Sequence, residues 1–252
     1  MSRTAGFFDQ WYTKMGRSGL RDQIARRALG LPPDMDVSGL LPWAGVAEVA
    51  AALNLAPGQL LVDLGCGRGG YGLEIARQTG ARLLGLDFSP VAVTAAANRA
   101  ASADIAGPAA FCVGTMTAAG VGAGAADAVV CIDTIMFTDA PLDALRECRR
   151  ILAAGGGLVL TSWEATNLAD KRLPQWARRL DLTRDLARAG FEQVAVTDKP
   201  AWREAERNLW ESAIQADATG DPAIESLQEE ARDALDLFDS SRRVCATATA
   251  PG

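Results

Sequence analysis

A glycine-rich segment is the part of the sequence whose residue types and spacing are best suited to hold a ligand. Residues 63–69 read Asp-Leu-Gly-Cys-Gly-Arg-Gly and precede a helical pattern over 70–78. Glycine permits the positive φ angles and the close approach of a ligand that a tight strand-to-helix turn requires, and the first turn of the helix leaves backbone N–H groups free. The spacing predicts a nucleotide-binding turn, and Gly65, Gly67 and Gly70 also fit the dinucleotide pattern G-x-G-x-x-G.

Asp63 lies just before the end of the apolar run 59–64. Its charge distinguishes two kinds of nucleotide ligand. A carboxylate there repels the pyrophosphate of a dinucleotide, whereas it attracts the sulfonium and ammonium groups of S-adenosylmethionine. Asp87 lies twenty residues after Gly67, where a carboxylate can accept hydrogen bonds from both ribose hydroxyls. The alternative interpretation of Asp87 is a helix cap or a turn residue, because Ser89 and Pro90 follow it. Phe88 is expected to lie against the adenine face.

The elements that must position these residues alternate along the middle of the chain. Short apolar runs predict strands, and segments with helical spacing separate them. Strands are expected at residues 59–64, 82–87, 109–113, 126–133, 158–163, 191–196 and 244–248, and helices at 70–78, 89–102, from 139 to the glycines 155–157, and at 182–189. This alternation predicts an α/β fold with a mainly parallel sheet covered on both faces.

Two helical regions lie outside this alternation. We expect one structural domain made of an N-terminal helical cap or lid (1–55), a core (56–199), a helical insertion that covers a substrate or packs as core (200–240), and the last strand with the C-terminus (241–252). The insertion carries one apolar stripe, Ile224, Leu227, Ala231, Leu235 and Phe238. All six tryptophans lie outside residues 44–162, which favours an apolar or aromatic acceptor pocket beyond the nucleotide core.

Composition narrows the possible chemistry. The chain contains no histidine, so histidine-based catalytic triads and histidine-ligated metal sites are excluded, and no metal is expected. The formal net charge is −6, which argues against a nucleic-acid partner. The arginine pairs at 26–27, 149–150, 178–179 and 242–243 are interpreted as solvated helix faces.

The cysteines and the apolar stretches bear on location. Five cysteines without a C-x-x-C pair predict free thiols and a cytoplasmic protein. Residues 1–30 show no signal-peptide pattern. The long uncharged stretch 105–126 holds Pro108 and five glycines, so no membrane association is expected.

Four motifs in order make a family resemblance specific. The segments VDLGCGRG, GLDFS, ADAVVCID and RILAAGGGLVL resemble those of class I S-adenosylmethionine-dependent methyltransferases, above all the UbiE-like and actinobacterial natural-product types. The resemblance covers about residues 55–195. It implies a Rossmann-like seven-stranded sheet with the last strand antiparallel, and a cofactor site at the carboxyl ends of strands one to four.

The resemblance implies S-adenosylmethionine as the cofactor and S-adenosylhomocysteine as its product. It also implies roles for individual residues around the cofactor. Gly65, Cys66, Gly67 and Gly69 match the loop around the methionine part, and Asp63 and Asp87 match the two acids. After strand three the family usually has Gly-Asp, whereas this chain reads Gly114-Thr115-Met116, so an ionised partner of adenine is missing. These three residues are still expected to contact the cofactor, Thr115 by a hydrogen bond and Met116 by packing on adenine. The further expected cofactor contacts are Tyr12, Trp43, Phe88, Asp133 and Thr134.

The methyl acceptor would receive its group by in-line displacement, so the protein mainly positions the reactants. Without histidine, the candidates for a base are Asp133, Glu164 and Tyr12, and a mechanism without a general base is equally open. A kcat/KM profile controlled by a histidine-like ionisation near pH 6.5 would have no source in this sequence.

The sequence thus predicts a methyltransferase that acts on O, N or C of a small molecule, a secondary metabolite with an apolar or aromatic portion. A homodimer is possible. Two alternatives stay open, a NAD-type oxidoreductase and a protein of the same fold that binds S-adenosylmethionine without methylating.

Overall fold

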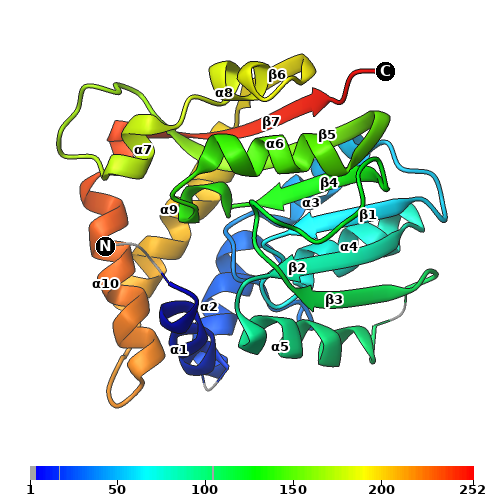
Figure 1. Cartoon of the computed structure of the whole chain (residues 1–252). Helices are drawn as coiled ribbons and strands as arrows, with labels where there is room; N and C mark the ends of the chain where they lie inside the picture. The colour runs from blue at the N-terminus through cyan, green and yellow to red at the C-terminus, as the bar shows by residue number, and fades with distance from the viewer. Residues whose placement is uncertain (1–3, 17, 104) are drawn as a thin grey trace.

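The computed structural model describes residues 4–16, 18–103 and 105–252. Its centre is a seven-stranded sheet with the order β3-β2-β1-β4-β5-β7-β6 (Figure 1). The strands are β1 (Leu60–Leu64), β2 (Arg82–Asp87), β3 (Ala109–Val113), β4 (Ala126–Ile132), β5 (Leu152–Ala165), β6 (Glu192–Asp198) and β7 (Ser241–Thr249). β7 runs antiparallel to both of its neighbours, whereas the pairs from β3 to β5 are parallel. This topology confirms the predicted fold class.

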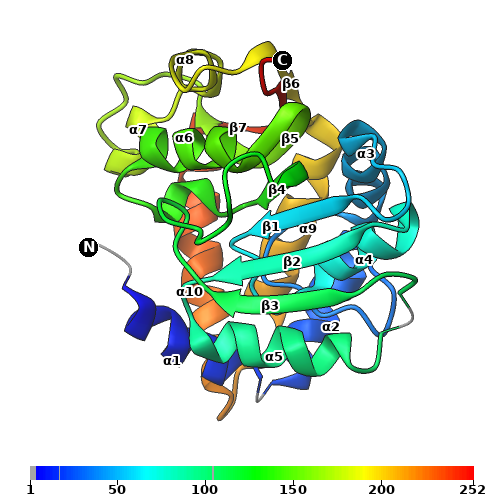
Figure 2. The same ribbon diagram turned by 45° about the vertical axis from the view of Figure 1, so that its right-hand side comes forward.

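Helices cover both faces of the sheet (Figure 2). They are α1 (Ala5–Met15), α2 (Gly19–Leu29), α3 (Trp43–Leu53), α4 (Gly70–Thr79), α5 (Pro90–Ala100), α6 (Pro141–Ile151), α7 (Gln175–Arg179), α8 (Leu182–Arg188), α9 (Pro200–Gln215) and α10 (Pro222–Asp236), with 3-10 turns η1 (Ile135–Phe137) and η2 (Phe238–Ser240). One apolar cluster joins α3, α4 and α9 to one face of the sheet, and a second joins α6 and α8 to the other. The sheet is therefore buried on both sides, as its continuous apolar strands require.

The N-terminal helices and the insertion between β6 and β7 form one helical group. α2 and α10 both pack on α9, and α1 contacts α10. Figure 2 shows α1 and α10 beyond the carboxyl ends of the strands, whereas α9 runs behind the sheet. Ile224, Leu227 and Ala231 of the α10 stripe are buried, and Leu227 and Ala231 belong to the same core cluster as Trp202 of α9. Part of the predicted stripe is thus core packing.

The connection from α6 to β5 differs from the prediction. The glycines 155–157 were expected to end the helix, but α6 ends at Ile151 and β5 begins at the next residue. The ladder between β4 and β5 is irregular near Ala126, Gly155 adopts φ 75°, and a Cβ at Gly156 would lie 2.9 Å from the carbonyl oxygen of Asp127. The glycines therefore shape an irregular start of the strand. The short elements η1 and α7 were not predicted from the sequence pattern either.

Cysteine and membrane features complete the description. Cys66, Cys112, Cys131, Cys148 and Cys245 are all free thiols. Within the described residues, no helix has the length and apolarity needed to cross a bilayer.

Candidate cofactor site

The glycine turn between β1 and α4 is built from left-handed backbone. Gly65, Gly67 and Gly69 have φ angles of 78°, 53° and 81°, which side chains other than glycine rarely adopt. The N–H groups of Gly65 and Cys66 donate to the carbonyl oxygen of Leu86 at 2.7 and 3.0 Å. The turn is thereby fixed to the carboxyl end of β2, next to the predicted ribose-binding acid.

Other parts of the chain approach these glycines closely. A Cβ at Gly65 would lie 2.6 Å from Cγ2 of Thr134, and one at Gly67 would lie 3.0 Å from Oγ of Ser38 and 3.2 Å from the hydroxyl of Tyr12. The structure thus brings the ends of β1 and β4 together with α1 and the segment before α3. The space over Gly65 and Gly67 is so small that an added methyl group would fill it.

The substitution Gly65→Ala tests this close approach. We expect it to lower the free energy of unfolding by about 2–4 kcal/mol, because it adds overpacking to the strain of a positive φ. Gly58→Ala is the matched control, because Gly58 has φ 85° with no other atom within 4 Å of the added Cβ, and we expect it to cost only about 1 kcal/mol. Urea unfolding of both variants measures the difference, and equal losses would contradict the described approach of Thr134.

Two acidic side chains are buried at the ends of neighbouring strands. Asp63 and Asp87 are 2% and 4% exposed. Burial raises the pKa of Asp63 to about 7, and the nearby charge of Asp87 contributes. Burial also raises the pKa of Asp87, opposed by hydrogen bonds that the N–H groups of Ser89 and Gly67 donate to it, each at 2.9 Å.

This pair of carboxylates fits a cationic nucleoside ligand. Ionised carboxylates without a counter-charge are unfavourable in a buried site, so a positive ligand group is attracted there. Oγ of Ser38 is buried beside Gly67 and interacts with the hydroxyl of Tyr12, so two hydroxyl groups lie next to the turn. The two buried carboxylates therefore suit S-adenosylmethionine better than the pyrophosphate of a dinucleotide.

Helix α1 covers this site with an aromatic face. Phe8, Tyr12 and Met15 form a buried cluster against which Phe88 and Phe137 pack, and the Phe8 ring lies 5.2 Å from Phe88 and 5.0 Å from Phe137. Burial, with the charge of Asp87, raises the pKa of Tyr12 above its ordinary value. The hydroxyl of Tyr12 lies beside Gly67 of the turn, whereas Phe88 packs on Phe8 of α1. The cofactor contacts of both residues stay predictions.

Side-chain hydrogen bonds hold α1 in place. Nε1 of Trp11 donates to Glu230 of α10 at 2.8 Å, and Oγ of Ser89 donates to Asp9. Arg21 of α2 lies over the Trp11 ring at 5.0 Å. α1 is therefore connected to both the insertion and the carboxyl end of β2.

The remaining predicted cofactor residues lie at different distances from the turn. The N–H of Gly114 donates to the carbonyl oxygen of Asp87 at 3.0 Å, Thr115 pairs with Ala118, and Met116 packs on the second core cluster. The Thr134 hydroxyl donates to the carbonyl oxygen of Leu64 at 3.1 Å. Trp43 packs on the first core cluster, and its contact with the cofactor stays a prediction.

Asp133 is engaged by three parts of the chain. It adopts φ 58° and accepts hydrogen bonds from the N–H of Leu40 at 2.7 Å and the hydroxyl of Thr161 at 2.6 Å. Nη2 of Arg243 lies 2.6 Å from its Oδ1, and both side chains are buried. A carboxylate paired in this way holds neighbouring elements together, and its role as a base stays a prediction.

Arg243 corrects one interpretation of the sequence. The pair 242–243 was expected on a solvated helix face, but Arg243 lies in β7 and is fully buried. Its guanidinium stacks on the Trp163 ring at 3.9 Å, and the Trp163 Nε1 donates to Glu206 at 2.7 Å. Ion pairing and stacking explain a burial that charge patterning alone did not indicate.

Glu164 is also occupied. Its Oε1 accepts from the N–H of Leu182 at 2.7 Å, and its Oε2 accepts from Arg242 at 2.8 Å. The side chain is 7% exposed. These contacts connect β5, β7 and α8, so Glu164 has a structural environment and its catalytic role stays a prediction.

Comparisons with known proteins agree with this geometry. Residues 62–160 match the family described as methyltransferase domain. Sterol 24-C-methyltransferase ERG6B of Gibberella zeae is 29% identical over 135 residues, and chloroplastic tocopherol O-methyltransferase of Arabidopsis thaliana is 27% identical over 142 residues. These alignments cover 53% and 56% of this chain but only 36% and 40% of the two relatives.

Solved structures share the fold over most of the chain. The [4+2]-cyclase SpnF has a TM-score of 0.78 at 23% identity, over 98% of this chain and 96% of that one. Haemonchus contortus phosphoethanolamine N-methyltransferase 2, in complex with S-adenosyl-L-methionine, has a TM-score of 0.74 at 18% identity, over 96% and 60%. Geranyl diphosphate C-methyltransferase from Streptomyces coelicolor A3(2) has a TM-score of 0.63 at 20% identity, over 93% and 99%.

The fold and the site agree with the resemblance to class I methyltransferases. Residues 62–160 match the methyltransferase domain family, and the fold of similar solved structures extends over most of the chain. S-adenosylmethionine is the cofactor of this class, in agreement with the resemblance drawn from the four motifs, and the match favours it over a dinucleotide.

Proposed function

We propose that this protein transfers the methyl group of S-adenosylmethionine to O, N or C of a small molecule with an apolar or aromatic portion. The observation that carries the proposal is the pair of buried carboxylates, Asp63 and Asp87, on either side of a left-handed glycine turn. A cation of nucleoside type satisfies both the charge and the shape of that place.

The residues around the glycine turn would each have a distinct role in methyl transfer. Bound S-adenosylmethionine supplies an electrophilic methyl group on its sulfonium. Asp87 accepts hydrogen bonds from the ribose, and Asp63 offers negative charge to the methionine part. The aromatic face of α1 excludes water from the turn. Because Asp133 and Glu164 are engaged in ion pairs, the rate would come from positioning of the two reactants.

The proposed class of methyl acceptor is supported by the substrates named with similar proteins. The sterol, tocopherol and geranyl diphosphate after which three similar methyltransferases are named are small molecules with large apolar parts. We extend this class to the present chain and place its acceptor in secondary metabolism. The cytoplasmic location, the possible homodimer and the lack of nucleic-acid or membrane partners stay predictions.

A second candidate function has one observation in its favour. The [4+2]-cyclase SpnF is similar in structure to this chain over nearly its whole length. A protein of this fold that binds S-adenosylmethionine without consuming it is therefore the alternative, and it too needs no general base from Asp133 or Glu164.

Two measurements test the proposal. Calorimetric titration of the purified protein is expected to show binding of S-adenosylmethionine and S-adenosylhomocysteine but not of NAD. Incubation with S-adenosylmethionine carrying a deuterated methyl group and a panel of apolar hydroxyl, amine and acidic-carbon compounds is then expected to give a labelled product by mass spectrometry. Binding without label transfer, combined with conversion of a compound by cyclisation, would establish the second candidate instead.

A further inference from the structure

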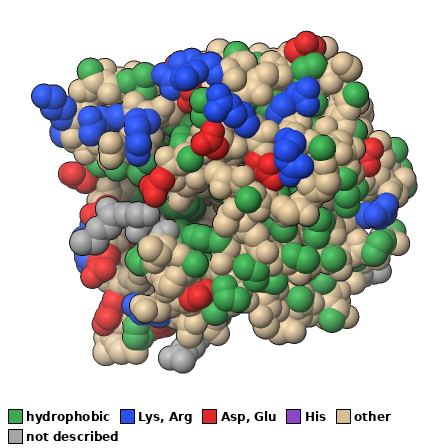
Figure 3. Space-filling view, in the orientation of Figure 1, with side chains coloured by type: hydrophobic (Ala, Val, Ile, Leu, Met, Phe, Trp, Pro, Cys, Tyr) green, Lys and Arg blue, Asp and Glu red, His purple; other side chains and the backbone are tan. Residues whose placement is uncertain are grey.

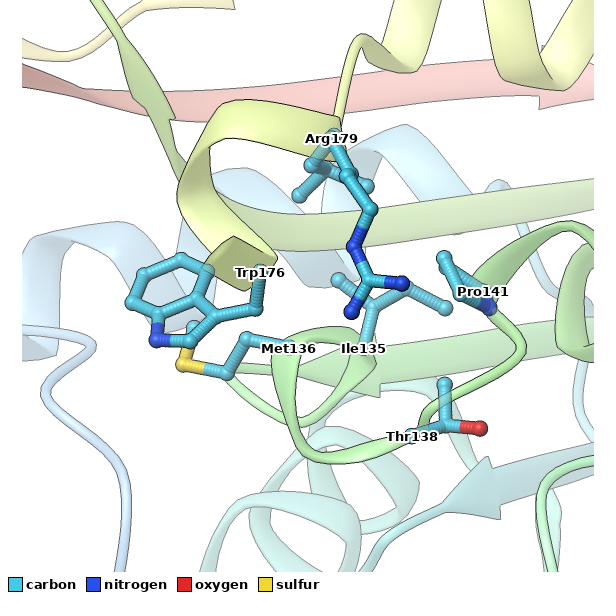
Figure 4. Close-up of a pocket in the computed structure, with 7 residues that line it drawn as sticks. Ile135, Met136, Thr138, Pro141, Trp176 and Arg179 are labelled. Atoms are coloured by element: carbon cyan, nitrogen blue, oxygen red, sulfur yellow. The ribbon is translucent and has the colours of Figure 1, made fainter. Parts of the chain in front are cut away.

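A small pocket lies at the carboxyl ends of β4 and β5, next to the candidate cofactor site. It lies between η1, the start of α6 and α7, and is lined by Ile135, Met136, Thr138, Pro141, Trp176, Arg179 and Leu180 (Figure 4). Ile135 and Leu180 are buried. Ligands of open α/β sheets bind outside the carboxyl ends of the strands, so this pocket has the right position for part of an acceptor.

One side chain of the pocket carries charge. Figure 4 shows the guanidinium of Arg179 pointing over Ile135 toward Thr138 and Pro141, while the Trp176 ring lies beside Met136. The pocket therefore offers an apolar wall and a cation together. The space it encloses is only about 10 Å³, room for about one water molecule, so a ligand end would lie against its mouth, on the exposed Arg179.

Arg179 differs from the basic residues around it. Arg172 and Arg184 form ion pairs with Asp170 and Asp185 at 2.7 and 2.8 Å. Within the described part of the chain, Arg179 has no carboxylate within the 4.0 Å of an ion pair. Its charge is thus available to a ligand.

The surroundings of Arg179 are basic although the chain as a whole is acidic. Residues 170–188 contain six Lys or Arg and three Asp, whereas the net charge of the chain is −6. Figure 3 shows Lys and Arg side chains gathered along the upper part of the face on which Figure 1 places α6, α7 and α8. Such a local field attracts anions to this edge of the molecule.

The pocket is physically connected to the cofactor cover. Its residues Ile135 and Met136 belong to the turn η1, which starts two residues after Asp133. Phe137 of the same turn packs on Phe8 of α1. A ligand held by Arg179 would therefore lie on the other side of η1 from the aromatic cover of the glycine turn.

We propose that Arg179 binds the anionic end of the acceptor, a carboxylate or a phosphate, while the adjoining apolar part of the acceptor lies against Trp176 and Met136. The inference rests on the proposed function and narrows its substrate class to amphiphilic anions. Arginine suits this role because its planar fork matches both carboxylate and phosphate oxygens.

The test uses three probes with S-adenosylhomocysteine present at saturation. Calorimetry compares 3-phenylpropanoate with 3-phenylpropan-1-ol, which lacks the charge, and with phenyl phosphate. At least one anion is expected to bind about tenfold more tightly than the alcohol, and Arg179→Gln is expected to abolish that preference. The tighter anion identifies a carboxylate or a phosphate as the preferred end group.

The matched control is Arg188→Gln. Arg188 is an exposed arginine of the same basic segment outside the pocket, and its replacement is expected to leave the preference unchanged. Equal binding of alcohol and anions, no binding of either anion, or an unchanged preference in Arg179→Gln would overturn the inference. Titration of S-adenosylhomocysteine alone separates this outcome from a failure of the proposed function, because Arg179→Gln should keep that affinity.

Discussion

Replacement of Arg243 by methionine is expected to lower the free energy of unfolding by about 3–5 kcal/mol. The variant leaves the Asp133 carboxylate, which is 4% exposed, without its ionic partner at 2.6 Å. A buried charge that loses its partner keeps the cost of desolvation and loses the compensating attraction. Urea unfolding of both proteins at pH 7 measures the loss.

A double-variant comparison separates this charge effect from lost packing. Asp133→Asn combined with Arg243→Met removes both charges, so we expect it to be more stable than Arg243→Met alone. Arg146→Met is the surface control, because Arg146 and Asp143 form a pair with both side chains more than half exposed, and its loss should stay below about 1 kcal/mol. A loss of that size for Arg243→Met as well would show that the buried pair does not stabilise this fold.

Binding of S-adenosylmethionine is expected to weaken by up to about tenfold per pH unit below pH 7. The pKa of Asp63 is raised to about 7 by burial, so the ligand-free protein carries a neutral Asp63 at lower pH. A cationic ligand favours the ionised form, and its binding at low pH must first remove the proton. Calorimetry in buffers of different ionisation enthalpy measures the affinity and the proton released.

Asp63→Asn provides the companion measurement. At pH 8 we expect this variant to bind S-adenosylmethionine about ten- to a hundredfold more weakly, with little dependence on pH, because its amide carries no charge. An unchanged pH dependence in the variant would show that another group is responsible.

The same substitution should stabilise the ligand-free protein at pH 8. A carboxyl whose folded-state pKa lies above its unfolded value contributes stability below pH 4 that is lost as the pH rises through about 7. The shift of Asp63 from 3.8 to about 7 corresponds to at most roughly 4 kcal/mol. Thermal unfolding of both proteins without ligand at pH 5 and pH 8 measures this gain, which should be largest at pH 8.

Asp63 also changes what a pH profile of this protein can mean. The absence of histidine excludes an ionisation near pH 6.5 that has the ionisation enthalpy of an imidazole. The buried carboxyl provides an ionisation in this pH range, and its small ionisation enthalpy distinguishes it from an imidazole. A profile with a midpoint near 7 therefore agrees with the site as long as its temperature dependence is small.

Sequence patterns identified the parts of the molecule whose structure is determined locally. The strands before Asp63 and Asp87 are short apolar runs, and the glycine turn needs left-handed backbone at fixed positions, so both could be read from consecutive residues. The short elements η1 and α7, of three and five residues, are too brief to show a period.

Contacts between distant segments could not be read in this way. Arg243 meets Asp133 across 110 positions of sequence, and Ser38 approaches Gly67 from a segment without regular structure. The arginine pair at 242–243 looked like a charged surface because charge patterning carries no information about a partner on another strand. The candidate bases Asp133 and Glu164 were found by position, but their ion pairs depend on the packing of β5, β7 and α8.

The attachment of α1 has a kinetic consequence. The hydroxyl of Tyr12 lies over Gly67, and Trp11 is hydrogen-bonded to Glu230 of α10. Any molecule that enters or leaves the glycine turn requires this helix to separate first from the insertion and from Phe88. The frequency of that separation sets an upper limit on the number of catalytic cycles per second, so solvent viscosity can slow steady-state turnover even when methyl transfer itself is fast.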